Sequence, residues 1–295
     1  MSQDTLTDLV AGHTITTRFG DNFRIVQPIG AGKNAAAFLA LQTSGINAGS
    51  FCALKVLQNT FGTRNLRRFQ AEIQALSRLQ HPSILRILDS GYIEANKFKH
   101  PFYLCEYYEE TLATAMRRGL SLPLKLAFAM QLVAGIVYLE KQHVVHCDIK
   151  PDNIFVRGFD CALADFGLVR FQSTHGENAI GPSLHHYRSP DIVNLFTKGS
   201  EITTKSDVFQ LGLVLVELFT GKNVCNSATS GNSPVVLDPL PSFHGTIGLK
   251  IRELLTSMLN YESTLRPNAS DLIENWQMLL FECIQHRNVQ EVRIF

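Results

Sequence analysis

The feature that most constrains this fold is a change of hydrophobic pattern near residue 108. Before it, the chain carries short runs rich in β-forming residues, FRIVQPIG, AFLALQT and FCALKVL, separated by turns at 30–34 and 45–50. An amphipathic helix follows, because apolar residues recur there at spacings of three and four until His81-Pro82 ends the pattern. Two more strand-like runs, ILRILDSGYI and PFYLCEYY, complete this part.

After residue 108 the pattern becomes helical. Apolar spacings predict helices over 124–142, 206–220, 249–259 and 269–281. The stretches 172–186 and 222–247 are rich in Ser, Gly, Asn and Pro and predict loops. We therefore expect an α+β protein of 295 residues, with an unpatterned N-terminal extension over 1–22, a β-rich part over 23–108 and a mainly α-helical part over 109–295.

Composition and charge narrow the classes of function. A chain that is 45% hydrophobic and 18% charged can bury a sizeable core, and its net charge of +1 gives no overall attraction to nucleic acid or to an anionic membrane. Six cysteines without C-x-x-C spacing predict a reduced, cytoplasmic chain rather than a zinc or redox site. The N-terminus lacks the pattern of a signal peptide, and the apolar run at 211–219 is too short for a membrane helix.

Two features of the β-rich part are weak evidence of chemistry when each is taken alone. Gly30 and Gly32 lie between two predicted strands, where glycine lets backbone amides approach a phosphate, although a plain turn is the commoner reason for such a pair. Lys55 lies inside an apolar strand and needs an anion to offset its desolvation. Glu72, at the edge of the inward face of the predicted helix, is the candidate partner, and an exposed lysine on a one-sided strand is the alternative.

The segment HCDIKPDN at 146–153 is the strongest evidence in the sequence. It joins a long predicted helix to an apolar strand and is too polar to belong to a core. Asp148 can accept a proton from an attacking hydroxyl, Lys150 can reach a transferring phosphate, and Asn153 can hold a metal ion. A polar turn between helix and strand is the alternative reading of these residues.

A second acidic segment follows twelve residues after Asn153. Asp165-Phe166-Gly167 comes directly after the apolar run CALA, and an Asp at the end of a buried strand is well placed to bind a hard cation. Gly167 permits a sharp turn after it. Taken alone, the tripeptide is weak evidence for a cation site. Its distance from the preceding motif makes it strong evidence.

Taken together, these segments resemble the motifs of the eukaryotic-like (Hanks-type) Ser/Thr protein kinase family, in order, over about residues 23–281. Ser189-Pro190-Asp191 resembles the Ala-Pro-Glu that closes the activation segment, and Arg266 matches the Arg that pairs with its acidic residue, here Asp191. Asp207 opens a segment that resembles the buried helix anchoring the catalytic loop. The resemblance implies a two-lobed fold, with a five-stranded antiparallel sheet plus one helix before a mainly helical lobe.

The same resemblance implies a Mg·ATP site, with Mn²⁺ as a possible substitute for Mg²⁺. Lys55, held by Glu72, is expected to position the α and β phosphates beside the loop of Gly30 and Gly32. The backbone of Glu106, Tyr107 and Tyr108 is expected to bind adenine, with Ala53 packed on its ring and Cys105 as the gatekeeper beside it.

For catalysis the resemblance implies that Asp148 orients and deprotonates a hydroxyl of a protein substrate, this chain included. Lys150 would steady the γ-phosphate, and Asn153 and Asp165 would hold the metal ion. A Lys two residues after the catalytic Asp, followed by Pro, is similar to the Ser/Thr branch of the family rather than to the tyrosine branch.

The sequence departs from the family at three places. Ala35 stands where the glycine-rich loop has its third glycine, and Cys147 replaces the Arg that contacts an activation-loop phosphate. Because a thiol cannot make that bidentate contact, we expect activity that does not depend on loop phosphorylation through this position. In the stretch 181–187 no Thr stands where Ser/Thr kinases place one, and Ser183, the nearest hydroxyl, is out of register.

Two other functions are alternative hypotheses for a chain with these motifs. A pseudokinase would bind Mg·ATP as a scaffold without phosphate transfer, but the five chemistry-bearing positions are all present: Lys55, Glu72, Asp148, Asn153 and Asp165. A small-molecule kinase of related fold would generally lack the Ser-Pro-Asp closure and the segment that begins at Asp207. A protein kinase is therefore the leading hypothesis.

Overall fold

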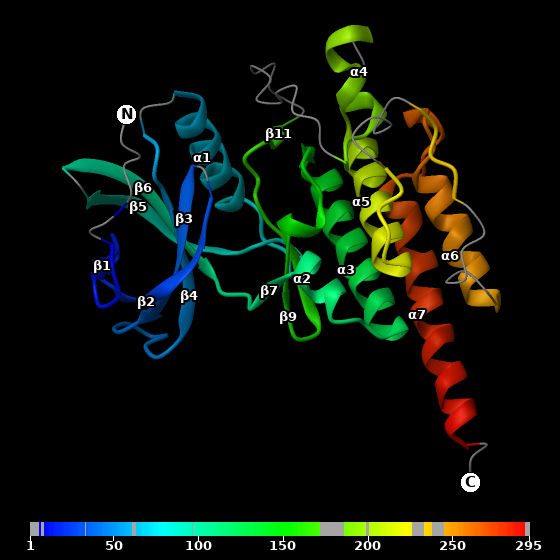
Figure 1. Cartoon of the computed structure of the whole chain (residues 1–295), viewed down its shortest axis with the longest axis horizontal. Helices are drawn as coiled ribbons and strands as arrows, with labels where there is room; N and C mark the ends of the chain where they lie inside the picture. Colours follow the sequence, from blue (N-terminus) through cyan, green and yellow to red (C-terminus); the bar gives the residue numbers. More distant parts are fainter. Residues whose placement is uncertain are drawn as a thin grey trace. The chain divides into compact units, whose positions relative to one another are not determined.

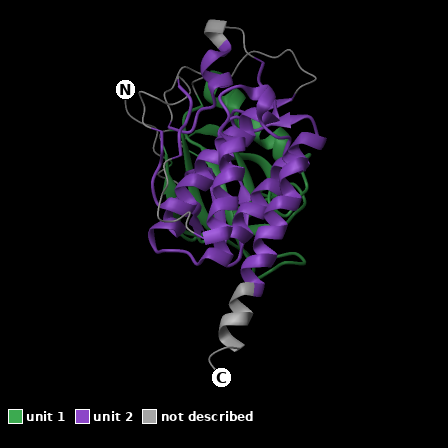
Figure 2. Ribbon diagram, turned by 90° about the vertical axis from the view of Figure 1, so that its right-hand side faces the viewer, with its two compact units in different colours: residues 1–109 green, residues 110–295 purple. Residues whose placement is uncertain are grey.

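The computed structural model describes residues 6, 9–32, 34–60, 63–95, 97–171, 186–198, 201–225, 233–237 and 245–292, with backbone only at 196–198 and 286–292 (Figure 1). The chain divides into two compact units, residues 1–109 and 110–295, coloured green and purple in Figure 2. The first contains an antiparallel sheet with a helix, and the second is mainly helical. The predicted α+β class is therefore confirmed.

The first unit is built on a sheet in the order β1-β2-β3-β4-β6-β5, in which every pairing is antiparallel. Its elements are β1 (Thr14–Thr16), β2 (Asn22–Ala31), β3 (Ala35–Gln42), β4 (Phe51–Leu57), α1 (Thr63–Leu76), β5 (Ile87–Ala95) and β6 (Phe98–Glu106). Strand β3 alternates strictly between half-buried and buried residues, as expected for a strand with one face on a core. The register of β4 with β6 places Ala53 opposite Cys105 and Lys55 opposite Tyr103.

The prediction of five strands was wrong, because the described sheet has six. The additional strand is β1, which pairs with β2 and lies within the stretch 1–22 that the sequence pattern assigns to an extension. Its central residue Ile15 is buried in the core of the sheet together with Leu6 and Leu9. A strand of three residues is too short to show a period, so pattern analysis has no signal to detect there.

The second unit carries α2 (Leu112–Arg117), α3 (Leu122–Lys141), α4 (Pro190–Lys198), α5 (Thr204–Thr220), α6 (Gly245–Met258) and α7 (Ala269–Val292), with the short 3₁₀ turns η1 (Pro151–Asn153) and η3 (Ser263–Leu265). Two small ladders accompany them: β7 (Glu110–Thr111) and β10 (Asp160–Leu163) both pair with β9 (Ile154–Arg157), and β8 (Val144–Val145) pairs with β11 (Arg170–Phe171).

Helix α5 forms the centre of this unit and packs against α3 (Figure 1). Thr203 caps its N-terminus by accepting from the Lys205 amide, and Gly221 ends it in the left-handed conformation at φ 73°. Fourteen of its residues are buried, including the polar Asp207 and Gln210. Because a buried polar group needs a hydrogen-bond partner, we expect both side chains to bond to another segment of the chain.

Helix α3 passes a simple test for a membrane span, since by length and composition it could cross a bilayer. In this structure 44% of an apolar 18-residue stretch of α3 is buried, and the core helix of a soluble protein passes the same test. Its contacts with α5, α7 and β10 explain its apolar composition equally well. The test is therefore weak evidence on membranes.

Candidate active site

The first unit holds an ion pair between the two positions that the sequence suggests as partners. Lys55 Nζ on β4 lies 2.8 Å from Glu72 Oε1 and 2.9 Å from Oε2 on α1. Glu72 is only 2% exposed, and Phe69, Ala75 and Leu76 are buried on the same helix. Glu72 thus lies at the centre of the inward face of α1, whereas the sequence pattern placed it at the edge.

Gly30 and Gly32 lie where β2 turns into β3. The Gly32 amide donates to the Ala35 carbonyl at 2.8 Å, which closes the turn. A Cβ added at Gly30 would meet nothing within 4 Å, and one at Gly32 would meet only that carbonyl at 3.7 Å. No described atom therefore packs closely against these two glycines, and the space beside the turn is open.

The residues expected to bind adenine lie at the end of β6, in the segment that follows it and on the neighbouring strand β4. Cys105 pairs with Ala53 across the sheet, and its thiol donates to the Ala53 carbonyl at 3.7 Å. Burial raises the pKa of Cys105 well above its ordinary value, so this thiol is neutral. Glu106 ends β6, and its amide donates to the Arg86 carbonyl. Tyr107 and Tyr108 follow in a segment that is neither helix nor strand.

In the second unit, the loop 146–153 is fastened to α5. The buried Asp207 accepts from the amides of His146 at 2.7 Å and Cys147 at 2.9 Å. Gln210 accepts from the Ile149 amide at 3.1 Å and donates to the Cys147 carbonyl. These bonds hold Cys147 at φ 69°, a left-handed conformation that a residue with a Cβ adopts only when its surroundings impose it.

The side chains of this loop converge on one carboxylate oxygen. Lys150 Nζ lies 2.8 Å from Asp148 Oδ2, and Asn153 Nδ2 donates to the same oxygen at 2.9 Å and to the Asp148 carbonyl at 2.9 Å. Asp148, Lys150 and Asn153 come from a loop and the following 3₁₀ turn, η1. The structure therefore brings these three predicted residues together.

Asp165 follows β10 and has a left-handed backbone at φ 60°. The amide of Ala164 donates to the Asn153 carbonyl at 2.8 Å, which ties this segment to η1. Phe166 is fully buried, with its ring centroid 4.4 Å from that of His146. Gly167 follows in the turn before β11, so the triplet is anchored by the phenyl ring.

A second buried ion pair closes the segment around α4. Arg266 Nη1 lies 2.6 Å from Asp191 Oδ2 and Nη2 lies 3.2 Å from Oδ1, which is a bidentate pair. Ser206 also donates to Asp191 Oδ2 at 2.9 Å. The predicted pairing of Arg266 with Asp191 is present in the structure. Residues 181–185, including Ser183, lie outside the described residues.

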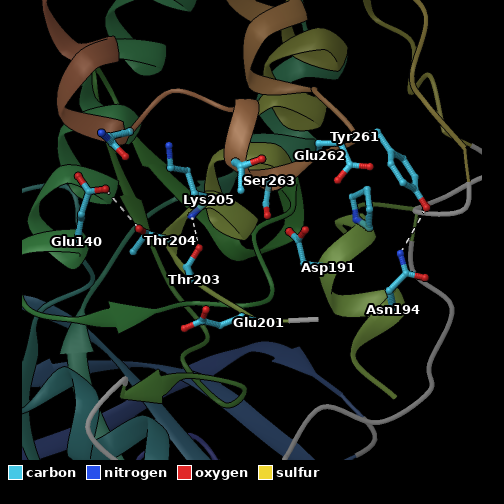
Figure 3. Close-up of a pocket in the computed structure, with 13 residues that line it drawn as sticks. Glu140, Asp191, Asn194, Glu201, Thr203, Thr204, Lys205, Tyr261, Glu262 and Ser263 are labelled. Atoms are coloured by element: carbon cyan, nitrogen blue, oxygen red, sulfur yellow. Dashed lines mark hydrogen bonds between the residues drawn. The ribbon is translucent and has the colours of Figure 1, made fainter. Parts of the chain in front are cut away.

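A cavity of about 670 Å³ lies beside this pair in the second unit (Figure 3). Asp191 is the one predicted site residue among those lining it: Glu140, Pro190, Asp191, Asn194, Glu201, Thr203, Thr204, Lys205, Tyr261, Glu262, Ser263, Thr264 and Asn268. Asp148, Asn153 and Asp165 are not among them. None of these three residues therefore lines the cavity.

Sequence reasoning missed three contributors to these arrangements. Gln210 stands three residues after Asp207 and is flanked by the apolar Phe209 and Leu211 on α5, and that spacing could have identified it. His146 was seen only as part of its segment, although it bridges Ala164 and Asp148. Tyr103 donates to Glu72, and no sequence signal reports this because cross-strand register is invisible in one sequence.

Comparison with known proteins gives a consistent result. Residues 23–277 match the protein kinase domain. The serine/threonine-protein kinase PrkC of Bacillus subtilis is 32% identical over 219 residues, which are 70% of this chain and 32% of that protein. The serine/threonine-protein kinase pkn2 of Myxococcus xanthus is 25% identical over 270 residues, 84% of this chain and 31% of that protein. The chain thus spans about a third of the length of these curated relatives.

Proposed function

Because the chain belongs to the protein kinase domain family, we propose that it transfers the γ-phosphoryl group of ATP, with Mg²⁺, to Ser and Thr hydroxyls of proteins, itself included. The observation that carries this proposal is the arrangement around Asp148. A carboxylate, an ammonium and an amide lie within hydrogen-bond distance of one another on a loop that α5 holds in place. Such positioning is most of what a phosphoryl-transfer enzyme contributes.

Asp148 is suited to orient and deprotonate the acceptor hydroxyl. Its Oδ2 accepts from Lys150 and Asn153, and no hydrogen bond within the described part of the chain ends on Oδ1. That oxygen can accept from a hydroxyl without breaking the existing contacts. Lys150 would turn from Asp148 to the γ-phosphate, where its positive charge is needed during transfer.

Asn153 and Asp165 have the chemistry of a Mg²⁺ site. Both carry hard oxygen ligands, and Mg²⁺ is commonly held by one or two such side chains together with substrate phosphates. The two bonds donated by Asn153 Nδ2 fix the amide so that its Oδ1 is the atom left for a cation. When bound, the ion would neutralise charge on the phosphates. Asn153 and Asp165 would hold it in place.

In the first unit, Lys55 would position the α and β phosphates while Glu72 orients it. The open space at Gly30 and the ion pair at 2.8 Å support these roles. The backbone of Glu106, Tyr107 and Tyr108 would bind adenine, with Ala53 against its ring. These assignments come from the resemblance of the motifs and are part of the proposal.

Specificity for Ser and Thr rests on two supports. Lys150 followed by Pro151 matches the Ser/Thr branch of the family. The bacterial relatives PrkC and pkn2 are both named serine/threonine-protein kinases. We propose a protein substrate on the same grounds.

The test is phosphate transfer from γ-labelled ATP with Mg²⁺, to a generic basic protein and to the chain itself. We expect label on Ser or Thr, reduced about 10²-fold or more in Asp148→Ala because the base is lost. Asp160→Ala, an exposed carboxylate at the start of β10, should transfer within about twofold of wild type.

Two outcomes contradict the proposal. Binding of Mg·ATP without transfer to any protein would identify a pseudokinase. Label on hydroxylated metabolites but not on proteins would identify a small-molecule kinase. An Asp148→Ala variant as active as wild type would contradict the role given to that residue.

A further inference from the structure

Tyr103 occupies a position in the first unit that the sequence motifs do not name. The register of β4 and β6 places it directly opposite Lys55. Its hydroxyl donates to Glu72 Oε1 at 2.8 Å, the same oxygen that lies 2.8 Å from Lys55 Nζ. Directly opposed residues of an antiparallel pair project from the same face of the sheet, so Lys55 and Tyr103 both reach Glu72 from that face.

The ring of Tyr103 contacts helix α1 as well. Its centroid lies 5.5 Å from that of Phe69, which is one turn before Glu72 on α1. Lys55 Nζ lies 5.5 Å from the Tyr103 ring centroid. Tyr103 is only 2% exposed, so its ring and hydroxyl are both enclosed. One side chain therefore joins α1 to the central strands twice, through an aromatic contact and through a hydrogen bond.

The hydroxyl matters because of where the Glu72 carboxylate lies. The Glu72 side chain is 3% exposed, whereas that of Lys55 is 27% exposed and reaches toward solvent. A buried carboxylate is costly unless hydrogen bonds replace its water. Lys55 supplies two contacts and Tyr103 a third. If Lys55 also interacts with a bound phosphate, the Tyr103 hydroxyl still donates a hydrogen bond to the Glu72 carboxylate.

We infer that Tyr103 is a positioning residue that fixes Glu72 on α1, and through it Lys55, before nucleotide binds. The inference rests on the proposed function, because it concerns the site for the ATP phosphates. It makes the Lys55–Glu72 pair a property of the resting first unit, built from Tyr103, Phe69 and Glu72. The pair then needs no separate activating event to form.

The test is Tyr103→Phe, which removes one oxygen and keeps the ring against Phe69. Tyr92→Phe is the matched control, since Tyr92 is 62% exposed on β5. Hydrogen exchange of amides at 69–76 should accelerate about tenfold in Tyr103→Phe, as expected when a hydrogen bond to a charged group is lost. Amides of α3 and α5 should exchange as in wild type in both variants.

Kinetics separate positioning from simple support of the fold. If fewer molecules hold Lys55 ready, the apparent affinity for ATP falls by that fraction, so the KM for ATP should rise about fivefold or more while kcat stays within about twofold. Loss of folded enzyme would instead lower the measured kcat at an unchanged KM. Tyr92→Phe should change neither constant.

The outcomes are distinct. Wild-type exchange rates at 69–76 in Tyr103→Phe would overturn the inference. Faster exchange with an unchanged KM for ATP would make Tyr103 structural only and would also overturn it. A wild-type chain without phosphate transfer would contradict the proposed function, and exchange at 69–76 would still show whether Tyr103 fixes Glu72.

Discussion

His146 is a buried histidine that acts as a neutral hydrogen-bonding residue. Its Nδ1 accepts from the Asp148 amide at 3.3 Å, so Nε2 carries the proton and donates to the Ala164 carbonyl at 3.0 Å. Burial lowers the pKa of His146 below its ordinary value of 6.5, while the nearby charges of Asp148 and Asp165 oppose this. The ring thus links the loop 146–153 to the segment of Asp165 without carrying charge.

This neutral histidine predicts a pH dependence of stability. Because the folded-state pKa is lowered, the unfolded chain binds the proton first, and folding loses stability as pH falls from 6.5 toward the folded-state pKa. The loss should reach roughly 1.4 kcal/mol for each pH unit in that window. Because burial raises the pKa of Asp207 to about 7, that carboxyl titrates in the same window with the opposite effect on stability, in wild type and variant alike. The contribution of His146 should therefore appear in urea unfolding from about pH 7.5 to about pH 5 as a difference in slope between wild type and His146→Gln.

The control is His143→Gln, which changes an exposed histidine near the same loop. Its stability should follow the wild-type pH curve. If His146→Gln and wild type ran parallel across the window, the neutral buried state of His146 would be contradicted.

At the scale of elements, the Arg266–Asp191 pair joins the residue after η3 to the first turn of α4. The Arg266 side chain is fully buried, and it also donates to the carbonyls of Asn260, Lys205 and Tyr261. Its guanidinium lies over the ring of Phe209, 4.8 Å from the centroid. One side chain therefore satisfies polar groups from several segments that have no ladder to pair them.

Replacing Arg266 should lower the stability of the fold substantially. Arg266→Met removes the cation from the buried Asp191 carboxylate, which keeps its hydrogen bond from Ser206, and takes this donor away from three carbonyls, so the free energy of unfolding should fall by about 3–5 kcal/mol. Lys250→Met is the matched control, because the Lys250–Glu282 pair has the same 2.6 Å distance but half-exposed side chains. It should cost less than about 1 kcal/mol. If chemical denaturation gave equal losses of unfolding free energy in the two variants, burial would not determine how much an ion pair stabilises this fold.

The elements also show what the sequence predicts and what it does not. Long apolar segments such as α3 and α5 are found where the sequence pattern places them, because a helix buried in the core must present apolar residues to its neighbours. The three-residue β1 carries no period, and α7 continues to Val292 after the predicted end at 281. Helix ends depend on local capping and on contacts made elsewhere in the fold.

The candidate site divides in the same way. Residues within one motif, such as Asp148, Lys150 and Asn153, are predictable because a short loop keeps them together. The contacts of Arg266 and Asp207 follow from the family resemblance rather than from their spacing. Tyr103 could not be found, since its role depends on which residue of β4 stands opposite it.

At the scale of the whole molecule, Cys147 bears on how the chain is controlled. It is 4% exposed and clusters with Val145, Ile192 and Ile202, and its thiol donates to the Val145 carbonyl at 3.7 Å. Burial raises the pKa of this thiol well above its ordinary value, so the position carries no charge at all. The position where the family usually has an arginine is therefore part of an apolar cluster in this chain.

We therefore predict that phosphatase treatment leaves the rate of phosphate transfer unchanged within about twofold. The reason is that position 147 has no cation to form an ion pair with a phosphate. The assay compares kcat/KM of treated and untreated protein, with mass spectrometry to establish that phosphate has been removed. Cys147→Ala should behave alike in both states, since it keeps the position apolar. A tenfold loss on dephosphorylation would contradict the prediction. The contact would then have to come from another cation, and Arg170, whose charge acts on the Cys147 thiol, is the residue to replace next.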